Sequence, residues 1–361
     1  MKSPRIEGMD GLRAYAVFLI FLIHFFGHYL NGEWGRPRIE FDAFDVQAAH
    51  GIGEWLAYYL WSSHYGVDLF FLISGFLIFR IVSRPTFSYA GFLWNRLVRI
   101  YPAYLIAVGL SLLYIARYWH QTFTLETIGE NLLLLHGIWE LKIPPIMTPT
   151  WSLAYEWIFY LVFPAILLFH RRGAPLGFWR LGVLAALILG AAAPIGEHYM
   201  RLLMFVLGAA LARTPAERLR KLAAKLPDEL VVLLYVAGNF LFVAVHDWYV
   251  FTPVYMLTCG LLFVNAVFGE GMLRRLLSLR PLMALGRVSY SFYLFHSLAV
   301  FIVCDNVGPR IGLPPGPALF ALAFAGSFAL ALAFSAISFR LFERPYFTRR
   351  IPTHGATRVA T

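Results

Sequence analysis

The apolar stretch LRAYAVFLIFLIHFFGHYL, residues 12–30, decides how the chain folds. Its length matches the roughly 20 apolar residues that a helix needs to cross a bilayer. No small-x-small cleavage site follows it, and many further apolar stretches do, so we interpret it as a retained helix and not as a signal peptide. This stretch predicts an integral membrane protein.

The composition of the whole chain supports the same prediction. Hydrophobic residues make up 60% of the 361 residues and charged residues 14%, whereas soluble domains carry roughly 45–50% apolar and about 25% charged residues. These values exclude a soluble enzyme, a disordered scaffold and a disulfide-rich secreted module. Cys259 and Cys304 both lie in apolar segments, and their spacing fits neither a zinc motif nor a disulfide framework.

Further apolar stretches follow residues 12–30 along the chain, without an internal repeat. We therefore expect an all-α membrane protein, with about ten transmembrane helices in a single domain over residues 1–361. In the second of these helices, Ser74 and Gly75 are small enough to let neighbouring helices approach closely. The expected spans are 12–30, 67–83, 101–118, 151–169, 180–196, 199–212, 229–246, 250–268, 288–307 and 315–340.

The basic residues predict the orientation of these helices. The chain has 30 Lys and Arg residues and a net charge of +10. Of the 30, 24 fall in alternate connections, a set that includes both ends of the chain. The positive-inside rule places this set, and with it both termini, in the cytoplasm. The excess charge therefore reports topology, and no nucleic-acid partner is expected because no basic domain stands clear of the membrane.

Arg13 and His24 are ionisable residues inside the first span, where such residues are costly. Eleven positions apart, they fall within roughly 20° of one helix face and about 16 Å apart along the axis. Arg13 is expected near the cytoplasmic face, and His24 in the outer half, where an imidazole could take a proton from an attacking hydroxyl. His24 could instead serve helix packing, or bind a metal ion with His28, one turn on. His296, in the ninth span, is a second candidate base, with helix packing as the alternative.

Two acidic residues lie in the outer halves of later spans. Asp68 is expected at the depth of His24, where it could orient the imidazole or pair with a basic residue. Glu156 could shape an acceptor pocket or form a structural ion pair. Trp151 and Tyr155 flank Glu156 and are candidates for contacting a substrate.

Arg96 and Arg99 precede the third span on the cytoplasmic side. Residues three apart share a helix face, and two guanidinium groups on one face suit a phosphate-rich ligand. The alternative is ordinary anchoring of the helix by lipid phosphates.

Five motifs, in this order, resemble the acyltransferase 3 family of bacterial membrane acyltransferases. The resemblance covers nearly the whole chain. The motifs are GMDGLRAYAVFLIFLIH (8–24), GVDLFFLISGF (66–76), NRLVRIYP (95–102), WSLAYEWIFYL (151–161), and SYSFYLFHS (289–297) with a late FERP (342–345).

The resemblance implies transfer of an acyl group, usually acetyl from acetyl-CoA, to a carbohydrate or related acceptor. It makes Arg13 and His24 the essential pair and places Arg96 and Arg99 in the basic cytoplasmic motif. It also implies a multi-pass protein of the bacterial inner membrane. Because the chain ends soon after the last span, we expect the standalone form without an added extracytoplasmic domain.

The expected mechanism follows from this resemblance. The phosphates of acetyl-CoA stay at the inner face against the three arginines, and the pantetheine arm reaches His24. The acceptor, expected to be an exopolysaccharide, another surface glycan or a lipid-linked precursor, enters from outside. His24 then acts as general base with Asp68 orienting it, or forms an acetyl-histidine intermediate. No metal is expected.

Two other classes of protein fit parts of the pattern. A transporter or flippase could use His24, Glu156 and His296 for proton coupling, although transporters often show internal repeats. A purely structural membrane subunit fits less well, because ionisable residues are frequent in the outer halves of the spans.

Overall fold

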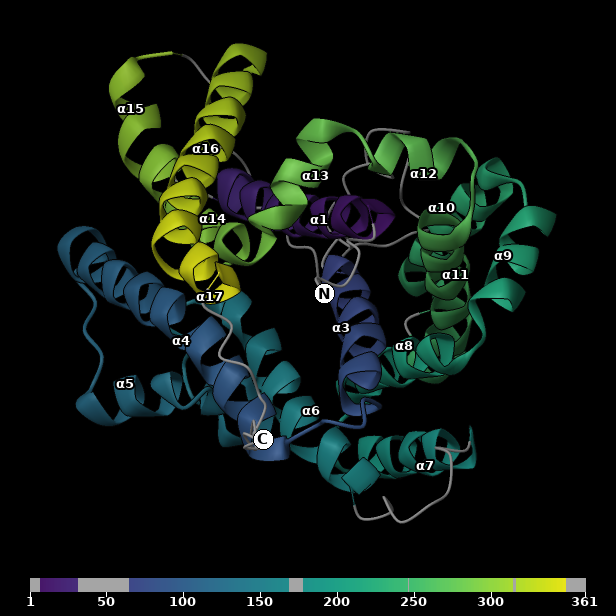
Figure 1. Ribbon diagram of the computed structural model, residues 1–361. Helices are drawn as coiled ribbons and strands as arrows, with labels where there is room; N and C mark the ends of the chain where they lie inside the picture. The colour runs from purple at the N-terminus through teal and green to yellow at the C-terminus, as the bar shows by residue number, and fades with distance from the viewer. Residues whose placement is uncertain (1–6, 32–64, 169–177, 246, 314–315, 349–361) are drawn as a thin grey trace, which may run out of the picture.

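The computed structural model describes residues 7–31, 65–168, 178–245, 247–313 and 316–348 of the chain. Over these ranges the protein is helical, with no strand (Figure 1). This confirms the all-α expectation for the described part of the chain. The long apolar segments fold as helices because a helix satisfies its own backbone hydrogen bonds in an apolar surrounding, whereas shorter helices such as Ala216–Lys225 are amphipathic.

The described residues form sixteen α-helices and seven shorter turns. The α-helices are α1 (Glu7–Asn31), α3 (Gly66–Val82), α4 (Tyr89–Tyr114), α5 (Leu125–Leu132), α6 (Trp151–Leu168), α7 (Phe178–Ile195), α8 (Leu203–Arg213), α9 (Ala216–Lys225), α10 (Asp228–Val245), α11 (Trp248–Phe268), α12 (Met272–Leu277), α13 (Arg280–Arg287), α14 (Ser289–Phe301), α15 (Gly308–Ile311), α16 (Pro317–Ser338) and α17 (Arg344–Thr348). Three π-helical turns are η4 (Ile115–Trp119), η9 (Ile302–Val307) and η10 (Phe339–Glu343), and four 3-10 turns are η5 (Leu135–Gly137), η6 (Trp139–Leu141), η7 (Thr148–Thr150) and η8 (Glu197–Leu202).

Every expected span overlaps one of these helices. Within the described ranges, four helical stretches could cross a membrane by length and hydropathy: Gly8–Tyr29, Tyr89–Trp119, Tyr249–Phe268 and Pro317–Phe347. A fifth joins them if α13 and α14, which are bent by 81° at their junction, count as one span. The ten-span topology and the cytoplasmic termini remain predictions.

Helix α1 crosses the middle of the molecule and packs on α3, α11, α12, α13, α14 and α16 (Figure 1). One stripe of its residues, four apart, is fully buried against α16. Phe21 and Phe25 each meet Phe324 edge-on, with ring centroids 5.4 Å and 5.2 Å apart. Because this aromatic stripe fixes the rotation of α1, the neighbouring stripe that carries His24 and His28 is held toward α14.

Helices α3 and α8 approach each other through glycine. A Cβ atom on Gly75 would lie 2.1 Å from the backbone oxygen of Phe205, and a Cβ atom on Gly208 would lie 2.1 Å from that of Leu72. No side chain fits at either position, so the two backbones pack directly. The expectation for Gly75 is confirmed, and the contact sets the position of α3 in the bundle.

The connection between α4 and α6 is folded by its own hydrogen bonds. The amide of Asn131 donates to Pro144 O at 3.0 Å and its oxygen accepts from Ile146 N at 3.0 Å. His136 Nε2 donates to Thr150 Oγ1 at 2.8 Å, and burial lowers the pKa of His136 to about 4. The imidazole is therefore neutral. The folded connection places η7 against α14 and the start of α6.

Candidate active site

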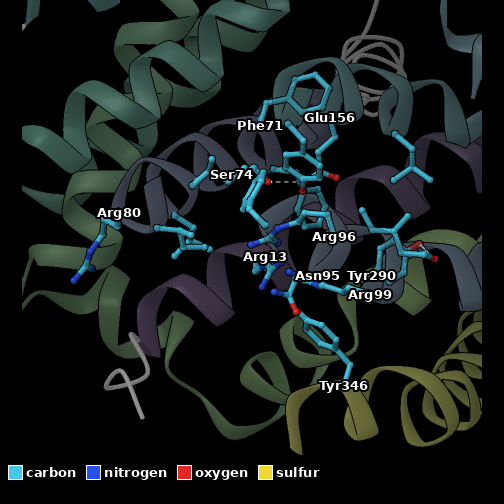
Figure 2. A pocket seen from close by; sticks show the side chains of 18 of the residues that line it. Arg13, Phe71, Ser74, Arg80, Asn95, Arg96, Arg99, Glu156, Tyr290 and Tyr346 are labelled. Atoms are coloured by element: carbon cyan, nitrogen blue, oxygen red, sulfur yellow. Dashed lines mark hydrogen bonds between the residues drawn. The ribbon is translucent and has the colours of Figure 1, made fainter. Parts of the chain in front are cut away.

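A cavity of about 530 Å³ lies between α1, α3, α4, α6, α14 and the C-terminal helix α17 (Figure 2). Its lining combines aromatic side chains with a concentration of arginines. The ionisable and polar residues that line it are Asp10, Arg13, Ser74, Arg80, Arg84, Thr86, Ser88, Asn95, Arg96, Arg99, Ser152, Glu156, Tyr160, Ser289, Tyr290, Tyr293 and Tyr346. Five arginines against two carboxylates give the cavity a positive charge.

Three of these arginines gather at the centre of the cavity, from two helices (Figure 2). Arg13 comes from α1, and Arg96 and Arg99 come from neighbouring turns of α4. Among the residues that the structure describes, none of the three forms an ion pair or a hydrogen bond. Arg96 instead lies over the rings of Phe92 and Tyr160, at 5.2 Å and 5.4 Å from their centroids.

The carboxylate of Glu156 does not neutralise these arginines by a direct ion pair. It accepts hydrogen bonds from Ser74 Oγ at 2.8 Å and from Tyr160 Oη. Ser74, expected to serve helix packing, therefore belongs to the lining of the cavity and holds Glu156 in place. Three half-buried cations that form no direct ion pair leave the cavity suited to an anionic ligand.

The C-terminal segment completes the cavity. Glu343 of the FERP motif is 1% exposed and accepts a hydrogen bond from Ser291 Oγ at 2.6 Å. This bond fixes η10 to α14, and α17 then places Tyr346 and Phe347 in the lining. The sequence showed the motif without its partner, since Ser291 and Glu343 lie on different helices.

The cavity is connected to His24 through α14. Tyr293 lines the cavity, and its backbone oxygen accepts a hydrogen bond from His296 Nδ1 at 2.7 Å. His296 Nε2 in turn lies 3.1 Å from His24 Nδ1. His296 is three residues beyond Tyr293, so the histidine pair lies about 4.5 Å further along the helix axis. Neither histidine lines the cavity itself.

These contacts fix the tautomers of the pair. His296 donates from Nδ1 and therefore presents an unprotonated Nε2 to His24. His24 Nδ1, 2.8 Å from Ile20 O, then carries the proton and shares it between Ile20 and His296. The Nε2 atom of His24 keeps its lone pair, which is the form of an imidazole that can accept a proton.

Asp68 has a different partner from the one expected. It forms an ion pair with Arg201, with Oδ2 and Nη1 3.5 Å apart, and both side chains are buried. His24 is oriented by Ile20 and His296 instead. The guanidinium of Arg201 also lies 5.4 Å from the ring centroid of Trp151, so Trp151 packs against the Asp68–Arg201 pair. The alternative interpretation of Asp68, pairing with a basic residue, is the one that the structure supports.

Tyr155 and His28 make contacts outside the cavity. Tyr155 is fully buried and stacks between Phe71 and Tyr199, at 6.1 Å and 5.4 Å. His28 binds Asp305, with Nε2 and Oδ1 2.5 Å apart. Across the described residues, no group of three or more His, Cys, Asp and Glu side chains is placed to hold a metal ion.

Comparison with known proteins gives consistent relatives. The family described as "Acyltransferase domain" matches residues 6–336. The chain is 29% identical over 312 residues to the exopolysaccharide production protein ExoZ of Rhizobium meliloti, covering 79% of this chain and 89% of ExoZ. It is 26% identical over 359 residues to the O-acetyltransferase OatA of Staphylococcus aureus, covering 84% of this chain and 52% of OatA, so it spans about half of that relative. No solved structure matches the chain.

Proposed function

Because the chain belongs to the acyltransferase domain family, we propose that it transfers an acetyl group from cytoplasmic acetyl-CoA to a hydroxyl of a carbohydrate. The acceptor would be a surface polysaccharide, an exopolysaccharide or a lipid-linked precursor. The names of two relatives, an exopolysaccharide production protein and an O-acetyltransferase, support this choice. The protein would act in the bacterial inner membrane with both termini in the cytoplasm.

Three arginines in the cavity, which form no ion pair within the described part of the chain, support this proposal. Acetyl-CoA carries several phosphate charges, and guanidinium groups bind phosphate through paired hydrogen bonds. Arg13, Arg96 and Arg99 would hold these phosphates. Arg80 and Arg84 line the same cavity and would add to the attraction.

The acetyl end of the donor would pass Tyr293 to reach His24. The acceptor hydroxyl gives its proton to His24 Nε2 while its oxygen attacks the thioester carbonyl carbon. The new oxygen–carbon bond forms as the carbon–sulfur bond breaks. The CoA thiolate leaves and takes the proton back from the imidazolium of His24. His296 supports the charged form of His24 by accepting the hydrogen bond from Nδ1.

Glu156 has a supporting part in this mechanism. Its carboxylate is fixed by Ser74 and Tyr160 and borders the cavity beside the arginines. It would accept hydrogen bonds from the amide groups of the donor arm. Asp68, paired with Arg201, would support the wall formed by α3 and η8 and not the base.

The donor site can be tested by kinetics on the purified, full-length protein. Arg96→Gln and Arg99→Gln should each raise the KM for acetyl-CoA by about tenfold, since one charge-assisted hydrogen bond contributes roughly 1.5 kcal/mol. Arg220→Gln is the matched control, because Arg220 is an exposed cation on α9 whose partner is Glu217. An unchanged KM for acetyl-CoA in both variants would contradict the donor site.

A further inference from the structure

A second polar cluster forms around His28, which follows His24 on α1, and it shares no residue with the cavity. His28 Nε2 and Asp305 Oδ1 are 2.5 Å apart, with side chains 23% and 26% exposed. The other carboxylate oxygen of Asp305 lies 3.1 Å from Trp119 Nε1 and 3.2 Å from Tyr114 Oη. Asn306 Nδ2 donates to Tyr114 Oη at 2.7 Å. We call His28, Tyr114, Trp119, Asp305 and Asn306 the outer cluster.

Two π-helical turns build the outer cluster. Trp119 is the last residue of η4, and Asp305 and Asn306 lie within η9. π-turns are rare and frequently occur at functional sites, because they shift side chains out of the regular helical register. Two of them, far apart in sequence, meet at one carboxylate. After Trp119 the chain leaves the helix at once, since His120 has φ 53°.

The groups of the outer cluster suit an uncharged polyhydroxyl ligand. The carboxylate accepts hydrogen bonds from hydroxyls, and an imidazole that donates from Nε2 keeps a lone pair on Nδ1 for another. Trp119 and His28 lie against the ring of Phe301, at 4.8 Å and 4.7 Å, so the polar groups stand on an aromatic wall. Among the described residues, the partners of Asp305 are His28, Tyr114 and Trp119 and include no Lys or Arg, so the charge of the carboxylate disfavours a phosphate ligand here.

The spacing along α1 relates the outer cluster to the reacting atoms. His28 follows His24 by four residues, so the two lie on one face, about 6 Å apart along the axis. That separation is close to the width of one sugar ring. A carbohydrate bound at His28 and Asp305 would therefore present a hydroxyl of the same ring, or of the next one, to His24.

We infer that the outer cluster is the acceptor subsite of this protein. A hydroxyl of an uncharged carbohydrate binds to the His28–Asp305 pair, with a sugar face against Trp119, while another hydroxyl is placed at His24. The inference rests on the proposed function and assigns its acceptor side to residues separate from the donor cavity. His28, Asp305 and Trp119 bind and position the acceptor, and they exchange no proton with it.

The test measures the KM for acceptor and the KM for donor separately. The probe is surface polysaccharide extracted from a deletion strain of the source organism and stripped of its O-acetyl groups, with the full-length protein in detergent. Asp305→Asn should raise the KM for this polysaccharide at least tenfold, and Trp119→Phe, which removes the indole N–H but keeps a ring, about threefold. The KM for acetyl-CoA should stay unchanged in both. His28→Gln, which keeps a neutral donor, should lie between them.

The controls separate this inference from the proposed function. Glu140→Gln changes a carboxylate outside the outer cluster, in the connection between α4 and α6, where it binds Tyr199. This variant should leave both KM values unchanged. Variants that keep the KM of the polysaccharide, or that raise both KM values together, would overturn the subsite and leave the acetyltransferase standing. No transfer by the unmodified protein would overturn the proposed function, and the subsite with it.

Discussion

The inner cavity and the outer cluster treat charge in opposite ways. In the cavity, Arg13, Arg96 and Arg99 form no direct ion pair with a carboxylate among the described residues. In the outer cluster, Asp305 receives hydrogen bonds from three different side chains, one of them an imidazole. The arginines of the cavity are thus available to a charged ligand, whereas the carboxylate of the outer cluster already accepts hydrogen bonds from within the protein.

This difference indicates what each end can bind. A buried charge without a partner is stabilised when a ligand brings the opposite charge, so the cavity favours a polyanion. A carboxylate already paired inside the protein gains little from a cation, and its remaining lone pairs favour neutral hydroxyls. The proposed site would thus be charged on the donor side and neutral on the acceptor side, with the histidine pair between them.

The largest expected effect comes from the residue between the two ends. His24→Asn should lower acetyl transfer by roughly 10²–10⁴-fold, the usual contribution of a general base. The affinity for CoA should stay within about twofold of the original, because the arginines are untouched. Calorimetric titration with CoA beside a transfer assay measures both. His198→Asn, a histidine whose nearest carboxylate is Glu140 at 4.0 Å, is the control, and full transfer by His24→Asn would refute the assignment.

The next effect concerns the packing of α3, which lines the inner cavity, against α8. Gly75→Ala would set a Cβ atom 2.1 Å from Phe205 O, and forcing the helices apart should cost about 1–3 kcal/mol. Gly109→Ala is the matched change, because its Cβ atom meets nothing within 4 Å. We expect a lower midpoint of thermal unfolding in detergent for Gly75→Ala alone. Equal midpoints for the two variants would disprove the direct contact of α3 with α8.

A smaller effect should appear within the inner cavity. Ser74→Ala removes one of the two hydrogen bonds that fix Glu156, which amounts to about 1 kcal/mol, or roughly fivefold in the KM for acetyl-CoA. The KM for the acceptor should not change, because the residue belongs to the donor side. Ser335→Ala, a buried serine bonded to its own helix at Ala331, is the control. A change in the KM for the acceptor alone would reverse the proposed division of the site.

The smallest effect concerns the connection between α4 and α6, where His136 is neutral. Its pKa falls from the ordinary 6.5 to about 4 on folding, so below pH 6.5 the unfolded chain binds a proton that the folded chain does not. Stability should therefore decrease as the pH drops from about 6.5 toward 4. His136→Gln should flatten this dependence, measured as unfolding midpoints between pH 7 and pH 5. An equally steep dependence in the variant would assign it to other groups.

The sequence predicted the helices better than their partners. Each span expected from hydropathy overlaps a described helix. The placement of Arg13 and His24 on one helix is confirmed by α1. The motifs also identified Arg96, Arg99 and Glu156, which the fold brings to one cavity with Arg13. Periodicity is a property of one helix at a time, so it placed Arg96 and Arg99 on one face of a helix, whereas their proximity to Arg13 and Glu156 comes from the packing of α1, α4 and α6.

Partners across helices required the structure. Asp68 meets Arg201 and His28 meets Asp305, and nothing in a hydropathy profile relates spans so far apart in sequence. Asp305 was hidden further because η9 shifts its register, and π-turns have no simple sequence pattern. Ser74 was interpreted as a packing residue because its neighbour Gly75 is one, although adjacent residues on a helix face different neighbours.

Helix α1 runs without a break from Glu7 to Asn31 and carries Arg13, His24 and His28. Its residue count is therefore a constraint on evolution and on engineering. A single inserted residue between Arg13 and His24 would rotate the outer half by about 100° and point both histidines away from α14. Substitutions leave this registration intact, whereas insertions and deletions do not. Only blocks of about seven residues, close to two whole turns, would return His24 to its face, about 10 Å further from Arg13. A variant for a longer acyl carrier would have to lengthen in such steps.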